Sequence, residues 1–231
     1  MRLIRAFRHA GSAILFATTF VWPWPLRRIL LGWLYGYRIH PEARIGFAWV
    51  RPKKLVMGRR ASIGNLTLCK GLELLELGDW ASIGKLNWIT GFPAGHPVHF
   101  ACDIGRIPSL ILGDHSAITN RHILDCTSPI RIGKFTTVAG FRSVFLTHSI
   151  DLGASRQSSK PIEIGDYAFV GTSCVVLGGS RLPSRCVLGA GSVLNKSYVE
   201  ELVLYAGVPA RSVKILDADL KYFLREVGYV D

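Results

Sequence analysis

The N-terminal quarter of the sequence almost lacks acidic residues. Residues 1–60 contain 12 Lys and Arg but a single acid, Glu42, whereas the rest of the chain contains 16 Lys and Arg and 15 acids. The net charge of +12 therefore belongs to the N-terminal region. A nucleic-acid-binding protein usually carries such charge on its folded body, so we expect no nucleic-acid partner. A basic arm beside apolar residues is more typical of a protein that contacts an anionic membrane surface.

Cysteine is scarce and irregularly spaced. The five cysteines form no C-x-x-C pair, and their number is odd: Cys69, Cys102, Cys126, Cys174 and Cys186. This pattern argues against a disulfide framework and against a clustered zinc site. We expect them to be small buried residues of a protein in the reducing cytoplasm.

The N-terminal region also lacks an apolar run long enough to cross a bilayer. Residues 10–26 carry no Asp, Glu, Lys or Arg, but they number 17, fewer than the ~20 that a spanning helix needs. Amphipathic aromatics typical of a membrane interface follow: Trp22, Trp24, Trp33, Tyr35 and Tyr37. We therefore expect residues 1–37 to form a helical anchor, peripheral on the inner face of the cytoplasmic membrane. A signal peptide and a helical cap on the next domain remain alternatives.

The middle of the chain repeats a short phrase, aliphatic-x-aliphatic-Gly-polar, followed by an aliphatic-small pair. Its copies begin at Leu55, Leu75, Leu110, Ile130 and Ile162. The aliphatic residues within a copy lie six positions apart, as Ile164 and Val170 do, which is neither a helical spacing nor a plain strand alternation. Six residues describe one flat side of a coil, and three sides make a turn of 18. Stacked coils would bury an aliphatic core and pair through parallel ladders.

This phrase resembles the hexapeptide repeat of the left-handed β-helix acyltransferases, over roughly residues 39–212. The left hand comes from the resemblance, since parallel crossovers are ordinarily right-handed. We expect a mainly β protein whose left-handed parallel β-helix occupies residues 38–212. Residues 213–231 contain apolar residues at helical spacing and are expected to form a C-terminal helix that covers the last coil or packs on a neighbouring subunit.

Two segments interrupt the period. Residues 88–109 and residues 149–160 contain no repeat, so we expect them to be loops that leave the coil, where binding residues tend to lie. The second begins directly after Thr147-His148. This pair resembles the catalytic histidine context of the maltose/galactoside O-acetyltransferase branch. Residues 188–193 and 206–211 resemble that branch's late Gly-Ala-Gly-Ser segment and its Gly-x-Pro-x-Arg closing turn.

The resemblance implies an acyl-CoA-dependent acyltransferase, with acetyl-CoA as co-substrate, no metal, and His148 as general base. A neutral imidazole with a pKa near ~6.5 can accept the proton of a hydroxyl that attacks a thioester. A backbone N–H would stabilise the oxyanion, and holding both substrates at once makes a covalent intermediate unnecessary. An O-acetyltransferase is therefore the leading hypothesis.

The resemblance also assigns the substrate-binding residues. Asn120 and Asp125 match positions that contact the acceptor, although Asn120 could instead belong to an internal side-chain ladder. The donor positions are Gly171, Thr172, Ala190, Lys196 and Arg211. Backbone groups of the first three would contact the pantetheine arm, and the two cations would meet phosphates.

The lead-in to the first coil, residues 30–36, resembles exopolysaccharide and capsule sugar acetyltransferases. The expected acceptor is therefore a sugar of a glycan or lipid-linked glycan precursor, and the expected assembly is a homotrimer. Two other classes stay open: a non-catalytic β-helix that binds or scaffolds, and a γ-class carbonic-anhydrase-like zinc enzyme that would use His115, His122 and His148. We expect His96, His99 and His122 to lie at the surface or in loops, with His122 a candidate to line the acceptor pocket.

Overall fold

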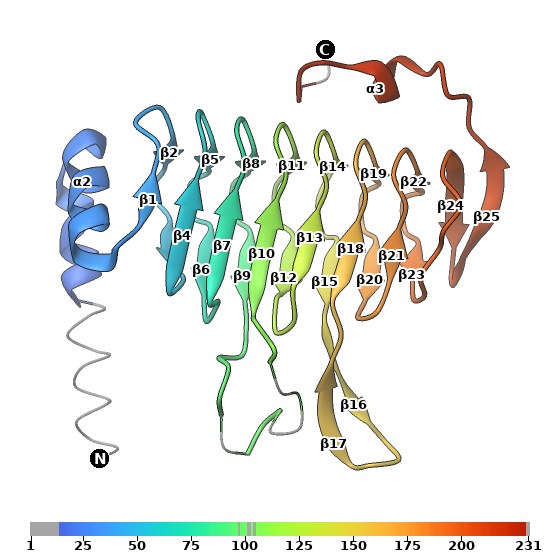
Figure 1. Ribbon diagram of the computed structural model, residues 1–231, viewed down its shortest axis with the longest axis horizontal. Coiled ribbons are helices and arrows are strands. Elements are labelled where there is room, and N and C mark those ends of the chain that lie inside the picture. The colour runs from blue at the N-terminus through green and yellow to red at the C-terminus, as the bar shows by residue number, and fades with distance from the viewer. Residues whose placement is uncertain (1–13, 97, 101–102, 104, 230–231) are drawn as a thin grey trace.

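Each copy of the repeat folds into one three-sided coil, and the coils stack along a common axis (Figure 1). The computed structural model describes residues 14–96, 98–100, 103 and 105–229. Three parallel sheets form the sides of the stack, and we name them A, B and C in the order in which the chain enters them. The expected left-handed parallel β-helix is confirmed.

Every coil contributes one strand to each sheet. Sheet A consists of β1 (Arg38–Ile39), β4 (Lys54–Met57), β7 (Leu74–Leu77), β10 (Ser109–Leu112), β13 (Ile130–Ile132), β18 (Ile162–Ile164) and β21 (Arg181–Leu182). Sheet B consists of β2 (Arg44–Ile45), β5 (Ser62–Ile63), β8 (Ser82–Ile83), β11 (Ala117–Ile118), β14 (Thr137–Val138), β19 (Phe169–Val170), β22 (Val187–Leu188), β24 (Val203–Gly207) and β25 (Ala210–Ile215). Sheet C consists of β3 (Trp49–Arg51), β6 (Leu68–Lys70), β9 (Trp88–Thr90), β12 (Ile123–Asp125), β15 (Val144–Leu146), β20 (Val175–Leu177) and β23 (Val193–Leu194).

The first aliphatic residue of each repeat forms a continuous buried column. In sheet A the register pairs these residues one above the next: Leu55, Leu75, Leu110, Ile130 and Ile162. All five are 0% exposed. The predicted core of stacked aliphatic side chains is therefore confirmed.

The turn of 18 residues holds at only some coils. Arg38 pairs with Val56 and Ile164 with Leu182, 18 residues apart in each case. Leu55 and Leu75, by contrast, are 20 residues apart. In these coils the strand of sheet B follows the strand of sheet A after the same short turn. The extra residues therefore lie mainly where the chain passes from sheet C to the next strand of sheet A. We call this edge the C–A corner.

The corner between sheets A and B is the most regular edge. Its glycines are required by the closeness of the next coil: a Cβ on Gly133 would lie 2.6 Å from the backbone nitrogen of Asp166. The left-handed backbone position of the same corner is taken by non-glycine residues such as Phe135 (φ 55°) and Tyr167 (φ 55°). Their rings stack at 4.7 Å between centroids. We call this edge the A–B corner.

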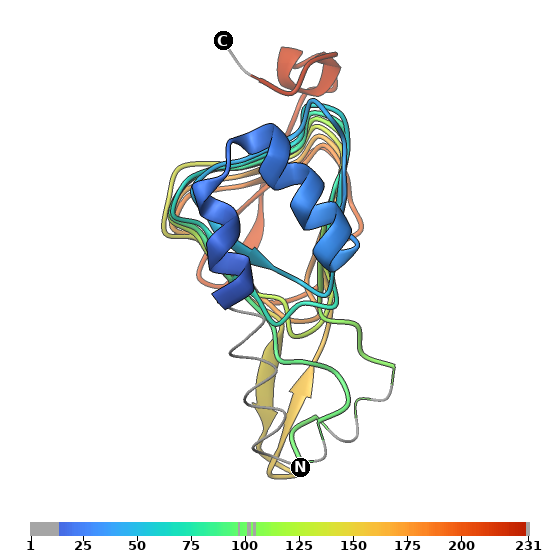
Figure 2. The ribbon, with the colours of Figure 1, turned by 90° about the vertical axis from the view of Figure 1, so that its left-hand side faces the viewer.

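The N-terminal residues cover the open end of the first coil (Figure 2). A helical turn at residues 14–18, η1 (Thr19–Val21) and α2 (Trp24–Tyr35) lie across it. Side chains of α2 donate to backbone carbonyls of the first coil: Trp24 Nε1 to Ala43 (2.9 Å) and Arg27 to Gly46 (3.0 Å). These donors satisfy carbonyls that would otherwise form an unpaired sheet edge. The helical cap, one of the alternatives from the sequence, is therefore present in residues 14–37, while residues 1–13 lie outside the described residues.

The opposite end is closed by an antiparallel pair, β24 and β25, joined at a cis Val208–Pro209 bond. The C-terminal helix is shorter than expected, since α3 spans only Lys221–Leu224. It does not cover the last coil. The segment instead runs back over the A–B corner, where the Tyr222 hydroxyl donates to Ala168 O (3.0 Å) and Gly228 approaches His115. The C-terminal segment buries aromatic surface along the A–B corner. This burial favours packing at that corner over packing on the exposed end of the stack.

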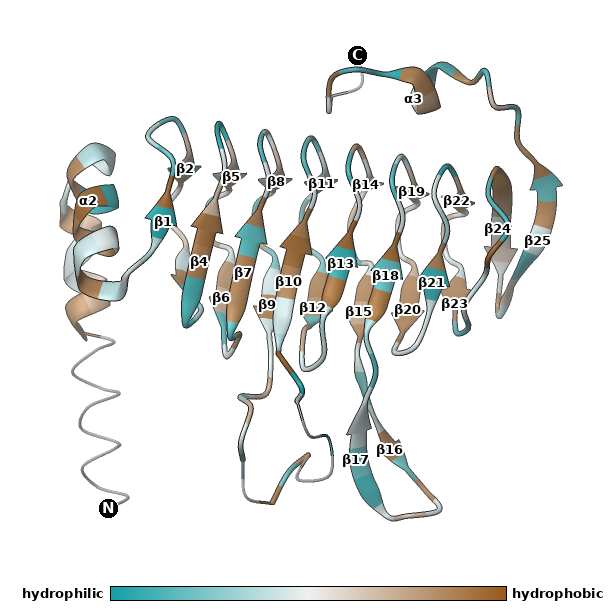
Figure 3. Cartoon of the chain, in the orientation of Figure 1, coloured by the Kyte–Doolittle hydropathy of each residue, from teal (hydrophilic) through white to brown (hydrophobic). Residues whose placement is uncertain are grey.

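Both interruptions of the repeat leave the stack at the C–A corner and project to the same side (Figure 1). The first, residues 91–108, follows β9 and contains no regular element among its described residues. The second, expected as a loop, is a β-hairpin of β16 (His148–Asp151) and β17 (Arg156–Ser159). Figure 3 shows hydrophobic and hydrophilic residues alternating along coil strands such as β7 and β13, whereas β17 is hydrophilic.

Candidate functional site

His148 and Asp125 lie side by side at the C–A corner. Asp125 ends β12, His148 follows β15, and these strands are neighbours in sheet C with Asp125 in register with Leu146. The register therefore places two residues that are far apart in sequence at the same edge of adjacent coils. The Nδ1 atom of His148 lies 2.5 Å from Oδ2 of Asp125.

The carboxylate of Asp125 is held by a set of donors. Its Oδ1 accepts from the hydroxyl of Thr127 (2.6 Å), and its Oδ2 accepts from the backbone N–H of His148 (3.2 Å) and the hydroxyl of Thr147 (3.3 Å). The residue is buried, with 8% exposure. Every one of these bonds uses the carboxylate as an acceptor, which is what an ionised side chain provides.

The same contacts orient His148. A carboxylate cannot donate, so Nδ1 of His148 carries a hydrogen, and Nε2 is the ring nitrogen that is left to accept a proton. Within the part of the chain that the structure describes, Nε2 has no hydrogen-bond partner. The imidazole side chain is 43% exposed, whereas that of Asp125 is 12% exposed. The pair therefore presents an oriented, accessible base.

The segment 91–108 packs against this base. The ring of Phe100 meets the His148 ring edge-on, with 6.0 Å between centroids. Arg106 lies over Phe100 at 4.5 Å and donates to the carbonyls of Phe92 (2.6 Å) and Thr127 (2.7 Å). Arg106 thus fastens the segment to the coil that carries Asp125.

The structure does not gather all the sequence-predicted site residues. Asn120 lies at the corner between sheets B and C, which we call the B–C corner, where its Oδ1 accepts from the backbone N–H of Lys85 (2.7 Å). This is the internal ladder that the sequence left open as an alternative. Asp125, assigned to the acceptor from the resemblance, has its carboxylate engaged with His148 and two threonines. Neither acceptor role is tested by these contacts.

The donor-site positions lie mostly at the B–C corner. Gly171 and Ala190 are adjacent there, since a Cβ on Gly171 would be 2.7 Å from the Ala190 nitrogen. Thr172 bonds through its hydroxyl to the carbonyl of Phe141 (2.9 Å). Lys196 follows β23 and lies at the C–A corner, with its ammonium 5.0 Å from the ring centroid of Tyr198. Arg211 lies on β25, opposite Ala206.

The donor-site residues of the B–C corner and His148 lie at opposite ends of the sheet C strands. Thr172 precedes β20, His148 follows β15, and the two strands are parallel neighbours. The starts of parallel strands share one edge of a sheet and their ends share the other. Most of the expected donor site and the base are therefore on different corners of one chain.

Among the residues that the structure describes, the other histidines do not form a metal-binding cluster. His122, expected at the surface or in a loop, is fully buried, and burial lowers its pKa to about 4. Its Nε2 bonds Thr119 Oγ1 (2.9 Å) and its Nδ1 accepts from Ser143 N (3.1 Å), so it is not free to bind a metal or line a pocket. His115 is stacked between Trp80 and Phe135. The zinc-enzyme alternative therefore loses His122 as a proposed ligand.

The four cysteines that the structure describes have no place in this site. Cys69, Cys126, Cys174 and Cys186 are free and buried, as expected, and Cys102 lies outside the described residues. Burial raises the pKa of each of the four thiols, that of Cys69 to about 12. Thiols with raised pKa values are poor nucleophiles.

Sequence reasoning missed the groups that support His148. Thr127 fixes the Asp125 carboxylate, and Phe100 and Arg106 pack over the base. The contact between Asp125 and His148 could have been found by aligning the coils, because Asp125 is then the strand neighbour of Leu146, two residues before His148. No repeat marks Phe100 or Arg106, since both lie in the segment that leaves the coil.

Comparisons with known proteins agree with this architecture. A scan against protein families found no match. Galactoside O-acetyltransferase of Escherichia coli is 35% identical over 69 residues, which are 29% of this chain and 34% of that protein. The chain thus spans about a third of the curated relative that it matches.

Solved structures extend the likeness over more of the chain. The polysialic acid O-acetyltransferase OatWY is 19% identical with a TM-score of 0.50, over 77% of this chain and 83% of its own. A hexapeptide-repeat acetyltransferase of Vibrio cholerae in complex with acetyl coenzyme A is 25% identical with a TM-score of 0.49, over 62% of this chain and 71% of that one. The resemblance to hexapeptide-repeat acetyltransferases is confirmed.

Proposed function

We propose that the chain is an acyl-CoA-dependent acyltransferase, an O-acetyltransferase, that modifies a sugar of a glycan or lipid-linked glycan precursor. The observation that carries the proposal is the bond of 2.5 Å between Nδ1 of His148 and Oδ2 of Asp125. It leaves an exposed imidazole nitrogen as a base at the corner from which both irregular segments leave. Acetyl-CoA, bound by a solved protein of similar architecture, is the proposed donor.

In the proposed reaction, Nε2 of His148 removes the proton of the acceptor hydroxyl as its oxygen attacks the thioester carbonyl. Asp125 stabilises the imidazolium that forms, because its carboxylate accepts from Nδ1. Collapse of the tetrahedral intermediate breaks the C–S bond, and the imidazolium returns the proton to the leaving thiolate. The products are the acetyl ester and free coenzyme A, with no covalent enzyme intermediate.

The experiment is transfer from labelled acetyl-CoA to sugar acceptors by the wild type and by His148→Ala. Removal of a general base is expected to lower the rate by roughly 10²–10⁴-fold. Ser149→Ala, one residue along the same strand, is the matched control and should keep the wild-type rate. Equal transfer by His148→Ala would remove His148 from the proposed role.

We further propose a homotrimer, in which the donor corner of one chain meets the base of its neighbour. The separation of Thr172 and His148 across sheet C supports this arrangement. Chains with His148→Ala and chains with Ala190→Trp, an exposed position where a large ring would block the donor, should each be inactive. Refolded together, they should regain activity if the site lies between chains; no recovery, or a monomer in sedimentation, would exclude the shared site.

Attachment to the inner face of the cytoplasmic membrane, an anionic surface, is a separate proposal. The face of the cap that points away from the coils is apolar: Val21 (80% exposed), Ile29 (57%) and Trp33 (81%). No helix in the described part of the chain is long and apolar enough to cross a bilayer. We propose that this apolar face contacts the bilayer surface, with basic residues around it.

Deleting residues 1–37 would also remove donors that cap the first coil, so point variants are the better test. Ile29→Glu with Trp33→Glu changes only the outer face and should abolish co-flotation with anionic vesicles. Val199→Glu, an equally exposed apolar position distant from the cap, should leave flotation unchanged. Unaltered flotation of the double variant would mean that the outer face of the cap does not bind the membrane and that the cap only covers the first coil.

A further inference from the structure

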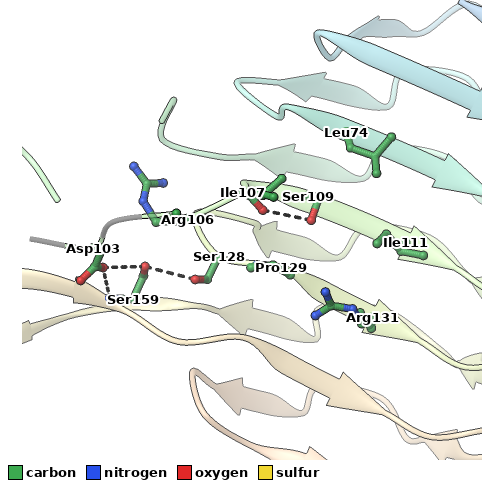
Figure 4. A pocket seen from close by; sticks show the side chains of 11 residues that line it. Leu74, Asp103, Arg106, Ile107, Ser109, Ile111, Ser128, Pro129, Arg131 and Ser159 are labelled. Atoms are coloured by element: carbon green, nitrogen blue, oxygen red, sulfur yellow. Dashed lines mark hydrogen bonds between the residues drawn. The ribbon is translucent and has the colours of Figure 1, made fainter. Parts of the chain in front are cut away.

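A cavity lies at the C–A corner, on the outer side of sheet A (Figure 4). Its volume is about 650 Å³, enough for a sugar with a substituent. Three parts of the chain enclose it: strands β7, β10 and β13, the segment 91–108, and the hairpin. It is therefore bounded by the two segments that interrupt the repeat.

The hairpin links this cavity to the base. Ser159 lines the cavity and is the register partner of His148 across β16 and β17. Side chains of directly opposed residues in an antiparallel pair point to the same face, with Cβ atoms about 5 Å apart. Ser128, next to Ser159 in the lining, donates its backbone N–H to Thr147 Oγ1 (2.9 Å). A molecule in the cavity thus lies next to His148 and the network around Asp125.

Most polar groups of the wall are already committed to one another. Asp103 accepts from both the backbone N–H and the hydroxyl of Ser159 (2.9 Å each), and the Ser128 and Ser159 hydroxyls are 3.2 Å apart. Figure 4 shows these bonds as a chain across the cavity wall. Arg106 donates to backbone carbonyls. These groups shape the cavity and hold the two segments together.

Arg131 is the exception. It projects from β13 into the lining and, within the described residues, has no hydrogen bond or ion pair. Glu163 is its register neighbour on β18, but no ion pair within 4.0 Å joins them. Arg131 is therefore a cation with five donors and no assigned acceptor. The two other charged residues of the lining, Asp103 and Arg106, are bonded to Ser159 and to backbone carbonyls.

We infer that this cavity binds the acceptor and that the acceptor carries an oxyanion, contacted by Arg131, on or next to the modified sugar. The inference rests on the proposed transferase function and specifies its substrate class. A guanidinium pairs with a carboxylate or a phosphate through two parallel hydrogen bonds, which orients the sugar as well as attracting it. The apolar side chains of Leu74, Ile111 and Pro129 provide the floor for the ring.

The first test compares acceptors that differ only in charge: glucose, glucuronate and glucose 1-phosphate. Arg131→Gln should lower kcat/KM for the acceptor that carries the anion by about 10–100-fold, the usual cost of losing a charge-assisted pair. It should leave glucose unchanged, and Arg131→Lys should retain part of the preference. Arg181→Gln, an arginine further along the outer side of sheet A but outside the cavity, is the matched control.

The second test separates this inference from the function on which it rests. Saturation-transfer NMR on His148→Ala measures binding of the same three sugars without requiring catalysis. Binding of an anionic probe that disappears in Arg131→Gln supports the cavity, even if no acceptor is acetylated and the proposed function fails. Equal binding of charged and neutral sugars, or binding of the anionic probe that survives in Arg131→Gln, would overturn the inference, whether or not the protein transfers acetyl groups.

Discussion

The A–B and C–A corners of the same coils differ in whether they accept inserted residues. At the A–B corner every turn is short, and the rings of Trp80, His115, Phe135 and Tyr167 stack on successive coils. At the C–A corner the register offset between neighbouring strands of sheet A varies from 18 to 35 residues. The regular corner has ring and backbone contacts with the next coil, whereas the irregular corner has polar side-chain networks and extruded segments.

This difference separates stability from chemistry. A repeat that must stack closely cannot accept extra atoms at the A–B corner, because each residue there contacts the coil before and after it. Residues added at the C–A corner leave the stack without disturbing the columns of aliphatic side chains. Asp125 and His148 lie where the coils allow insertion, on strands that the rest of the fold keeps rigid.

Asp125→Asn is expected to have the largest effect at the irregular corner. The amide can donate to Nδ1 of His148 and thereby favour the tautomer in which Nε2 carries the hydrogen, so the base is lost while the shape is kept. Acetyl transfer should fall by roughly 10²–10⁴-fold, with little change in the urea midpoint. The measurements are the steady-state rate of acetyl transfer and the midpoint of urea denaturation.

Asp114→Asn is the matched control for that prediction at the regular corner. Its Oδ1 accepts a bond from Asp79 N (2.9 Å), which an amide oxygen also provides. The rate should therefore stay at the wild-type value. A comparable loss of activity in both variants would mean that the contrast between the corners is wrong.

Gly133→Val should lower stability and leave specific activity unchanged, the opposite of what we expect for Asp125→Asn. A Cβ at this position meets the backbone of Gly165 and Asp166, which cannot move without separating two coils. Overpacking of this kind costs about 1–3 kcal/mol or more, so the urea midpoint should fall while the folded fraction keeps its specific activity. Gly153→Val at the hairpin tip, where the nearest atom is 3.5 Å away, is the control and should be neutral.

The sequence was sufficient for the stacked fold because the repeat is a local pattern with a single consistent solution. The aliphatic residues from Leu55 to Ile162 could be assigned to one buried column without knowing any contact between coils. The Thr147-His148 pair likewise stood at the end of a repeat. These features depend on neighbours in the chain, which a sequence displays directly.

Contacts that depend on register were less accessible. The bond between Asp125 and His148 follows only when the extra residues at the C–A corner are counted, and the six-residue period gives no count for them. The return of the C-terminal segment to the A–B corner depends on the ring stack, which involves residues outside the repeat phrase. Arg131 resembles any exposed arginine until the cavity is formed.

His122, which lies away from the C–A corner, should make the free energy of unfolding pH-dependent. Burial lowers its pKa from 6.5 to about 4, so the unfolded chain binds a proton that the folded chain excludes. Its stabilising contribution is complete above pH 6.5 and decreases as the pH falls toward 4, by at most about 1.4 kcal/mol per pH unit. Urea denaturation at pH 7 and pH 5 measures the slope, which should become shallower in His122→Gln. An unchanged slope would assign the acid sensitivity to other groups.

Phe135→Leu is the mildest change that still distinguishes the two corners. The ring lies 4.8 Å from His115 and 4.7 Å from Tyr167, nearly parallel to both, so its loss removes two stacking contacts but keeps most apolar volume. A loss of about 0.5–1.5 kcal/mol is expected, with no change in acetyl transfer. Trp33→Leu, an exposed ring on α2 outside the stack, controls for the loss of a surface ring and should change neither quantity. If Phe135→Leu instead altered activity without altering stability, the A–B corner would take part in the reaction.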